Sequence, residues 1–137
     1  MFSYKTGFLA LLVLVILSNA WHLSQRPKEA SEVRSSKVVF VTGGTGPFRE
    51  SAAAGAKEAA REFDLDLEVN MPKQAEGLED QMKILSTLNP ANLGGIALSP
   101  VDAEQQTRLI NQLSAKTSVL TFDSDAPLSN RLGYAGA

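Results

Sequence analysis

The segment Thr42–Arg49 contains a glycine-rich turn that could face a ligand. It reads Thr-Gly-Gly-Thr-Gly-Pro-Phe-Arg and lies between an apolar, β-branched run and a stretch rich in helix-forming residues. The unpaired N–H groups and the positive end of the helix dipole at such a turn favour an anion or a hydroxyl-rich ligand. Glycine also supplies the backbone angles that a tight turn needs, so these glycines have a structural explanation as well.

Three aspartates and one phenylalanine form a second set of candidate binding groups. Asp102 follows one short apolar run of the sequence, and Asp123 and Asp125 follow the next one. Ionised carboxylates accept hydrogen bonds from hydroxyl groups, and an aromatic ring such as that of Phe48 packs against the C–H face of a sugar. The structural alternatives are a helix N-cap at Asp102, a turn at the aspartate pair and a helix-covering role for Phe48.

These groups do not predict an enzyme or a metal site. Two close carboxylates can bind a cation or act as acid and base, but the sequence offers Asp123 and Asp125 no identifiable third ligand or nucleophile. The chain has no cysteine, and its one histidine, His22, cannot build a metal cluster alone. We therefore expect no catalytic residue, no metal and no cofactor.

Length and charge set further limits on function. The 137 residues, 44% of them hydrophobic, correspond to one small domain or to part of a larger one. Thirteen Lys and Arg against fifteen Asp and Glu give a formal net charge of −2. This balance favours neither a nucleic acid nor an anionic membrane surface as a partner, and we expect a monomer without a nucleic-acid partner.

Short apolar runs alternate with helix-forming stretches from residue 37 onward. The patterns predict strands at 38–41, 65–71, 95–98 and 119–122, a strand beginning near 131, and helices at 51–63, at 77–88 and after Asp102. On the first helix, Ala59 and Phe63 belong to the predicted packing face. Continuously apolar strands between helices indicate an α/β fold, a doubly wound parallel sheet with right-handed crossovers. Ligands bind such sheets beyond the carboxyl ends of the strands, where the strand order reverses.

Residues 1–20 have the layout of a secretory signal peptide. Lys5 precedes an uninterrupted apolar run, Phe8–Leu17, and Ser18-Asn19-Ala20 provides a small-x-small cleavage pattern. As a helix this run spans about 15 Å, half of the roughly 30 Å hydrocarbon core of a bilayer. We predict export to the periplasm or the extracellular space, with cleavage after Ala20. An uncleaved membrane anchor and a buried core helix are the alternatives.

The glycine-rich turn resembles that of one enzyme family. Val-Thr-Gly-Gly-Thr-Gly is similar to the TGxxGxxG turn of dinucleotide-binding dehydrogenases and epimerases. Arg49 stands at the third glycine of that pattern, where close packing of helix on strand needs no side chain. The second predicted strand ends at Asn70-Met71 rather than at a ribose-binding acid. An NAD(P)-dependent Rossmann domain is therefore the alternative hypothesis from a different functional class.

A second resemblance covers residues 37 to 137. Gly46-Pro47-Phe48 before an alanine-rich helix, Leu98-Ser99-Pro100-Val101-Asp102, and Leu-Thr-Phe-Asp-Ser-Asp at 120–125 are similar to strand exits of the type I periplasmic binding proteins, in their ribose-binding-like group. The resemblance implies that Phe48 contacts a sugar ring and that aspartates bind its hydroxyls. The ligand-binding residues that we infer are Thr45, Gly46, Phe48, Arg49, Asp102, Asp123 and Asp125. At Arg49 the family commonly has a second aromatic, and this difference changes specificity.

The same resemblance implies a role and a domain layout. The family supplies extracytoplasmic carbohydrate-binding components that deliver a small sugar to the membrane permease of an ABC transporter, without chemistry. We expect a linker at 21–36, an N-terminal lobe at 37–126 and the start of the crossover to a second lobe at 127–137, in a truncated chain that binds sugar weakly alone. Related lactose-repressor proteins begin with a helix-turn-helix, whereas this chain begins with the signal-like segment.

Overall fold

A computed structural model describes residues 35–74 and 77–136 of the chain. The predicted signal peptide and most of the predicted linker lie outside these residues. Within the described residues, the structure has five strands and three α-helices: β1 Lys37–Val41, α2 Pro47–Glu62, β2 Asp66–Asn70, α3 Leu78–Thr87, β3 Gly95–Leu98, α4 Ala103–Ser114, β4 Val119–Phe122 and β5 Gly133–Ala135, with a short 3-10 turn at Pro90–Asn92 before β3. None of the helices in the described part of the chain combines the length and the hydropathy of a membrane span.

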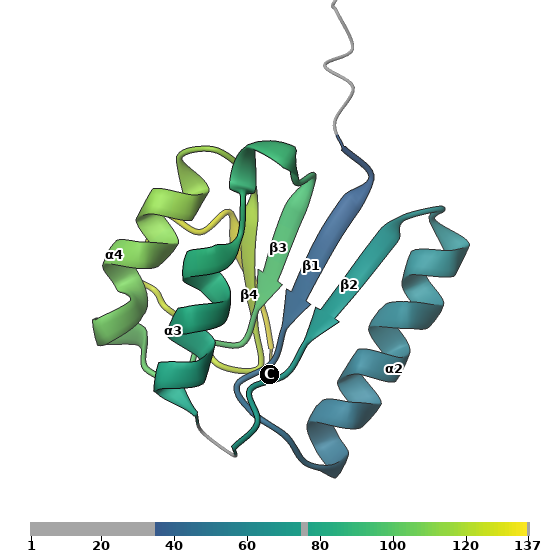
Figure 1. Cartoon of the computed structure of the whole chain (residues 1–137), viewed down its shortest axis with the longest axis horizontal. Helices are drawn as coiled ribbons and strands as arrows, with labels where there is room; N and C mark the ends of the chain where they lie inside the picture. Colours follow the sequence, from purple (N-terminus) through teal and green to yellow (C-terminus); the bar gives the residue numbers. More distant parts are fainter. Residues whose placement is uncertain (1–34, 75–76, 137) are drawn as a thin grey trace, which may run out of the picture. The chain divides into compact units, whose positions relative to one another are not determined.

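All strand pairs are parallel, and the strand order is β2-β1-β3-β4-β5. The chain moves from β1 outward to β2 and then crosses back over β1 to β3 and β4. Right-handed crossovers in these two directions place α2 on one face of the sheet and α3 and α4 on the other (Figure 1). The predicted doubly wound α/β fold is confirmed, and the strand order reverses between β1 and β3.

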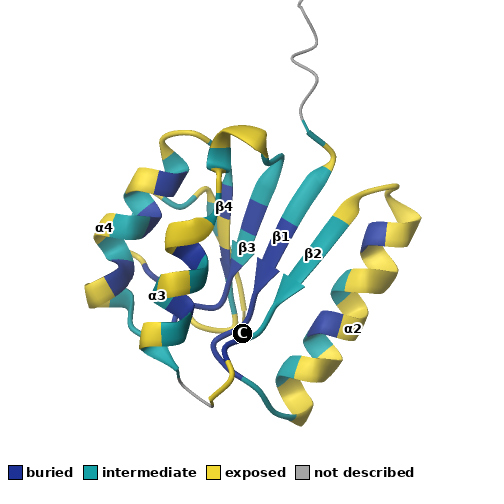
Figure 2. Ribbon diagram, viewed as in Figure 1, coloured by how far each residue is buried: buried dark blue, intermediate teal, exposed yellow. Residues whose placement is uncertain are grey.

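The main core lies between the sheet and the pair α3 and α4. It is formed by fully or nearly buried aliphatic side chains from three strands, from both helices and from the segment after β4, namely Val39, Val41, Leu85, Ile96, Leu98, Ile110, Leu113, Val119 and Ala126. Alternate residues of β1 and β3 point into this layer because successive side chains of a strand face opposite sides. The buried positions are the dark bands on these elements in Figure 2. Val41 and Leu98, the last residues of β1 and β3, belong to this core, so it fixes the positions at which the two candidate loops begin.

The opposite face has a lighter covering. α2 packs over β2 and buries only the small side chains of Ala53 and Ala60 completely. Phe40 of β1 and Phe122 of β4 stack with ring centroids 4.4 Å apart, on either side of the strand β3. The prediction that Ala59 and Phe63 face the sheet is wrong, because both are exposed. Phe63 is the C-cap of α2, where the backbone leaves the helical conformation and the helical spacing no longer applies.

Helix α2 begins four residues earlier than the sequence pattern predicted. Pro47 is its first residue, so Phe48 and Arg49 belong to the first helical turn and not to the preceding loop. Proline is favoured at this position because its fixed φ suits a helix and its missing N–H would have had no helical partner. The start of α2 therefore fixes where the side chains of Phe48 and Arg49 leave the backbone.

The fifth strand belongs to this same sheet. β5 pairs in parallel with β4, with Thr121 opposite Tyr134 and Phe122 opposite Ala135. Within the segment 127–137, which was expected to start the crossover to a second lobe, Gly133–Ala135 therefore belong to the sheet of this lobe. β4 and β5 are joined without a helix, by turns across residues 123–132. This short connection keeps Asp123, Asp125 and the start of β5 close together.

Candidate functional site

The loops after β1 and β3 meet at the carboxyl edge of the sheet, where the strand order reverses. The amide of Ser99 donates to the carbonyl of Val41 at 2.9 Å. A Cβ atom at Gly43 would lie 3.3 Å from the carbonyl oxygen of Ser99 and 3.4 Å from its Oγ. The close approach of the two loops therefore leaves little room for any side chain at Gly43. Open parallel sheets bind their ligands at this position.

The loop from Thr42 to Gly46 is shaped by glycine. Gly44 and Gly46 have φ of 151° and 127°, angles that side chains rarely allow. The buried hydroxyl of Thr42 donates to the carbonyl of Gly44 at 2.6 Å and closes the turn. Gly46 is the N-cap of α2 and offers no capping side chain. The first turn of this 16-residue helix is therefore left without a side-chain acceptor for its N–H groups.

Phe48 and Arg49 differ in their surroundings. The Phe48 side chain is 64% exposed, so its ring is open to solvent. Arg49 is partly buried, and its Nη1 donates to the carbonyl of Thr45 at 3.3 Å. The Nε atom of Arg49 is buried without a hydrogen-bond partner. The guanidinium group thus lies near the carboxyl edge of the sheet, with most of its donors unused among the described residues.

Two buried glutamines, which the sequence analysis missed, hold the loops in place. Gln81 of α3 is fully buried, and its Nε2 donates to the carbonyls of Thr42 and Ser99, both at 2.8 Å. Its Oε1 accepts from the amide of Val101 at 3.1 Å and from Nε2 of Gln106 at 2.7 Å. One side chain therefore uses both donors and both main acceptor positions to connect the two loops.

Gln106 of α4 extends this network to Asp102, at the end of the loop between β3 and α4. It is also fully buried, and its Oε1 accepts from the amide of Asp102 at 2.9 Å. The sequence contained a signal for both residues, because Gln81 precedes Leu85 by four positions and Gln106 precedes Ile110 by four. A polar residue on the inward stripe of a helix must find buried partners, and here these are the backbone groups of the binding loops.

Asp102 has the predicted N-cap role. Its Oδ1 accepts from the amide of Gln105 at 2.9 Å, and its Oδ2 accepts from the side chain of Gln105 at 2.7 Å. These bonds, the backbone one first, hold the pKa of Asp102 below its usual range. The carboxylate is therefore ionised at neutral pH and fixed at the start of α4. An N-cap and a hydrogen-bond acceptor for a ligand are compatible roles for it.

The cap makes a testable contribution to stability. We expect Asp102→Ala to lower the thermal midpoint by a few degrees, because the amide of Gln105 loses its acceptor. Asp102→Asn should leave the midpoint nearly unchanged, because asparagine caps helices about as well as aspartate. Circular dichroism melting curves of both variants check this. Equal midpoints for Asp102→Ala and wild type would contradict the capping role.

Asp123 is an exposed carboxylate on an unusual backbone. Its φ is 62°, which is rare outside glycine, and its amide donates to the carbonyl of Ala135 at 3.1 Å. Its own carbonyl accepts from the Tyr134 hydroxyl at 2.9 Å. The side-chain Oδ2 accepts from Oγ of Ser99 at 3.4 Å, while its Oδ1 has no protein partner in the described part of the chain. The backbone thus holds Asp123 beside the β1 and β3 loops with an available oxygen.

Asp125 has a structural role. Its Oδ2 accepts from Nη2 of Arg131 at 2.8 Å, and its Oδ1 accepts from Nε of the same residue, from the Thr121 hydroxyl and from the Ala126 amide. The guanidinium of Arg131 holds the pKa of Asp125 far below its usual range. Both side chains are about three-quarters covered, with exposed fractions of 24% and 22%. The structure therefore places Asp125 in an internal ion pair rather than among the open groups.

The carboxyl edge brings together most of the predicted residues. Thr45, Gly46, Phe48 and Arg49 come from the first loop and helix turn, Asp102 from the start of α4, and Asp123 from the end of β4. Among the described residues, no three His, Asp or Glu side chains are grouped as metal ligands. Asn70 is the last residue of β2, the position at which the dinucleotide-binding pattern has its acidic residue. Its side-chain Nδ2 donates to Oε1 of Glu68. Apart from Asp125, the grouped residues are donors and acceptors suited to a polyhydroxyl ligand.

Comparison with known proteins identifies the family. Residues 37–137 match the periplasmic binding protein domain. The chain belongs to this family. The predicted family is thereby confirmed over residues 37–137, and its fold agrees with the parallel sheet described above. Among curated proteins, no sequence matches the chain.

Solved periplasmic binding proteins have the same fold. GanP, a glucose-galactose binding protein from Geobacillus stearothermophilus, is 30% identical over 75% of this chain and 37% of its own, with a TM-score of 0.69. XylFII in the XylFII-LytSN complex is 31% identical over 73% of this chain and 37% of its own, with a TM-score of 0.67. A sugar-binding protein of an ABC transporter from Legionella pneumophila has 22% identity over 72% and 38%, with a TM-score of 0.66, and shows the shared fold alone. The chain thus spans little more than a third of these relatives.

Proposed function

We propose that this chain is the sugar-binding component, or the first lobe of one, that serves an ABC transporter outside the cytoplasmic membrane. It binds a small carbohydrate at the carboxyl edge of the sheet and carries out no chemistry. The support comes from the family, from the similarity to a glucose-galactose binding protein and from the open donors and acceptors at the edge. The membrane partner in this proposal is the transporter permease.

The observation that carries the proposal is the placement of Asp123. The left-handed backbone, two backbone contacts and Ser99 hold its carboxylate at the edge, and the residue is exposed. A non-glycine residue in this conformation has a conformational cost, and such residues cluster at functional sites. An ionised carboxylate that is held in place accepts strong hydrogen bonds from sugar hydroxyls. Phe48 adds an exposed aromatic face at the start of α2.

Export and incompleteness are part of the proposal. The apolar run at 8–17 after Lys5 supports a signal peptide, and the family supports an extracytoplasmic location. The matched part of this chain covers only 37% of each of these two relatives, so we propose that a second lobe closes over the sugar in the complete binding protein. One lobe buries a sugar from one side only, and its affinity is correspondingly low.

Thermal unfolding in the presence of ligands tests this function. A ligand that binds only the folded state raises the unfolding midpoint by mass action. We expect a concentration-dependent rise with at least one member of a panel of pentoses, hexoses and their acid derivatives, and none with NAD. A rise with NAD alone would favour a dinucleotide-binding domain, and no rise with any sugar would contradict the proposed function.

Two matched variants connect the response to the site. Asp123→Asn removes the charge but keeps a side chain that tolerates a left-handed backbone, so we expect it to lose the sugar response with little change in the midpoint. Asp64→Asn is the control, because Asp64 is the other non-glycine residue with positive φ, at 53°, and lies between α2 and β2 at the opposite edge. A sugar response that survives in Asp123→Asn would remove Asp123 from the site.

A further inference from the structure

We infer that the ligand of this edge is an acidic sugar, a monosaccharide that carries a carboxylate, and that Arg49 is the residue that selects it. The inference rests on the proposed sugar-binding function and narrows it from carbohydrates in general to one chemical class. Its basis is the partly buried guanidinium of Arg49, which has no ion-pair partner among the described residues, at the same edge of the sheet as the exposed carboxylate of Asp123. Together the two groups call for a ligand that has hydroxyl donors and an anionic acceptor.

The guanidinium of Arg49 lies close to the loops after β1 and β3. A Cβ atom at Gly43 would lie 3.7 Å from Nε of Arg49 and 3.4 Å from Oγ of Ser99. Ser99 in turn donates to Oδ2 of Asp123 at 3.4 Å. Arg49 therefore lies near Gly43, Gly43 near Ser99, and Ser99 near Asp123. A ligand that extends along Gly43 and Ser99 can reach both charged groups.

The charge of Arg49 is not balanced within the described part of the chain. The ion pairs there join Lys37 to Glu68, Arg61 to Glu58 and Arg131 to Asp125, and none includes Arg49. Its Nη1 reaches only a backbone carbonyl at 3.3 Å, and its Nε has no acceptor. A partly buried charge without a counter-charge is unfavourable, so an anion at the Nη edge would be stabilised.

Arg131 shows how this molecule otherwise accommodates a partly buried guanidinium. That residue is 22% exposed and is held by both oxygens of Asp125. This two-point contact is the geometry in which arginine recognises a carboxylate most strongly. At Arg49 the protein supplies no equivalent carboxylate among its described residues. We infer that the carboxylate of a sugar acid occupies that role.

The remaining groups at the edge favour a sugar acid over a simple anion. Asp123 has a carboxylate oxygen without a protein partner among the described residues, so it accepts hydrogen bonds from hydroxyl groups, which a sugar acid has and an anion such as acetate lacks. The first-turn N–H groups of α2 add a positive potential on the side of Arg49. The edge is thus polarised, with the carboxylate of the ligand directed to Arg49 and its hydroxyls to Asp123.

Titration of the full chain with matched sugar pairs tests the inference. Glucose with glucuronate and galactose with galacturonate keep the same ring and differ only in that a carboxylate replaces the C6 hydroxymethyl group, and chemical-shift changes of the Gly43 and Gly44 amides report binding. We expect at least one acid to bind about tenfold more tightly than its neutral partner, a difference of about 1.4 kcal/mol. The preference should weaken as salt is added, because salt screens the charge interaction.

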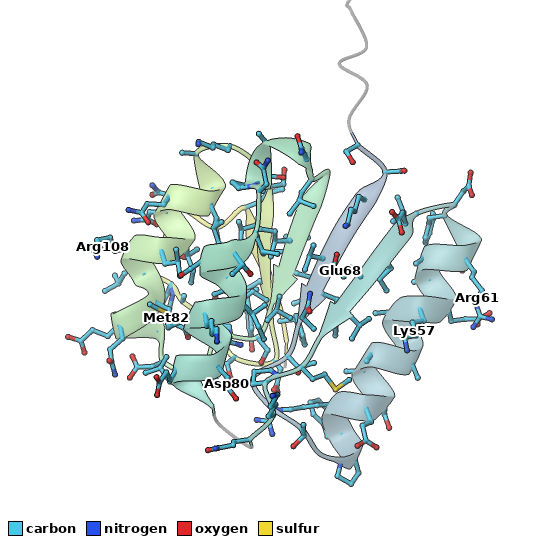
Figure 3. All side chains as sticks on the ribbon, viewed as in Figure 1. Lys57, Arg61, Glu68, Asp80, Met82 and Arg108 are labelled. Atoms are coloured by element: carbon cyan, nitrogen blue, oxygen red, sulfur yellow. The ribbon has the colours of Figure 1, made fainter. Side chains whose placement is uncertain are left out.

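Variants assign the preference to Arg49. We expect Arg49→Gln to reduce the ratio of the two affinities to about one, and Arg49→Lys to retain part of it. Arg108→Gln is the control, since Arg108 is exposed and projects outward from α4 (Figure 3), and it should keep the full ratio. A ratio that persists in Arg49→Gln would overturn the role of Arg49.

The other outcomes separate this inference from the proposed function. Neutral sugars that bind as tightly as their acids would overturn the acidic ligand and leave sugar binding standing. Shifts with acetate equal to those with the sugar acids would show a general anion site and overturn the inference. If no sugar of either kind perturbs the Gly43 and Gly44 amides, both the acidic ligand and the sugar-binding function are contradicted.

Discussion

Replacing Gln81 with leucine is expected to lower the free energy of unfolding by about 3 to 5 kcal/mol. The buried side chain donates to the carbonyls of Thr42 and Ser99. It also accepts from the amide of Val101 and the side chain of Gln106. Leucine leaves these four groups without their partner, and each unpaired buried group costs about 1 to 3 kcal/mol, not additively. Urea denaturation measures the change through the midpoint and slope of the transition.

Two further variants distinguish the network from a general effect of the substitution. Lys83→Leu places the same residue at an exposed position of α3 and should change stability by no more than about 0.5 kcal/mol. Combining Gln81→Leu with Gln106→Leu should cost less than the sum of the single changes, because the double variant no longer contains the unpaired amide of Gln106. A loss for Gln81→Leu no larger than that for Lys83→Leu would contradict the account.

Acidification is expected to destabilise the wild-type chain more steeply than Asp125→Asn. Arg131, and then Thr121 and Ala126, stabilise the ionised form of Asp125 and lower its pKa in the folded state. The unfolded chain, where the pKa of aspartate is about 3.9, therefore binds the proton first. The contribution of Asp125 to the free energy of unfolding is fully present above that value. It is lost as the pH falls toward and through the lower pKa of the folded state. The free energy of unfolding, measured from pH 7 down to the acid limb, tests this difference.

At neutral pH the same variant should be less stable than wild type, because asparagine cannot form the charge-assisted pair with Arg131. Glu62→Gln is the matched control, since Glu62 is an exposed residue at the end of α2. We expect its stability to follow the wild-type curve over the whole pH range. Parallel acid limbs for wild type and Asp125→Asn would show that the ion pair does not contribute to acid lability.

The sequence predicted those elements whose local pattern matches their tertiary role. The bounds of β3 and β4 agree with the predicted 95–98 and 119–122, because each is a continuous apolar run that becomes buried. Asp102 was predicted to cap α4, and the cap forms through contacts within three residues. The preference for right-handed crossovers then predicts helices on both faces of the sheet, as observed for α2 on one face and α3 and α4 on the other. In each case short-range information was sufficient.

Contacts between distant segments were not predictable in the same way. Gln81 binds Thr42 from 39 positions away, and only its place on the inward face of α3 indicated that it is buried. The engagement of Asp125 by Arg131 required the turn after β4 to bring two otherwise unremarkable residues together. The pattern also placed Asp123 and Asp125 in one group, because sequence adjacency does not show which carboxylate faces the edge and which faces a guanidinium.

The position of β1 has a consequence for the order in which the fold can form. β1 is the first strand in the chain, but it is paired on both sides, with β2 and with β3. Its second partner begins at Gly95, and every pairing is parallel and requires an intervening crossover. Sheets dominated by such non-local pairings fold slowly. β1 therefore keeps one edge unpaired until the residues up to Leu98 have been synthesised, so a nascent chain that stops short of β3 cannot form this sheet.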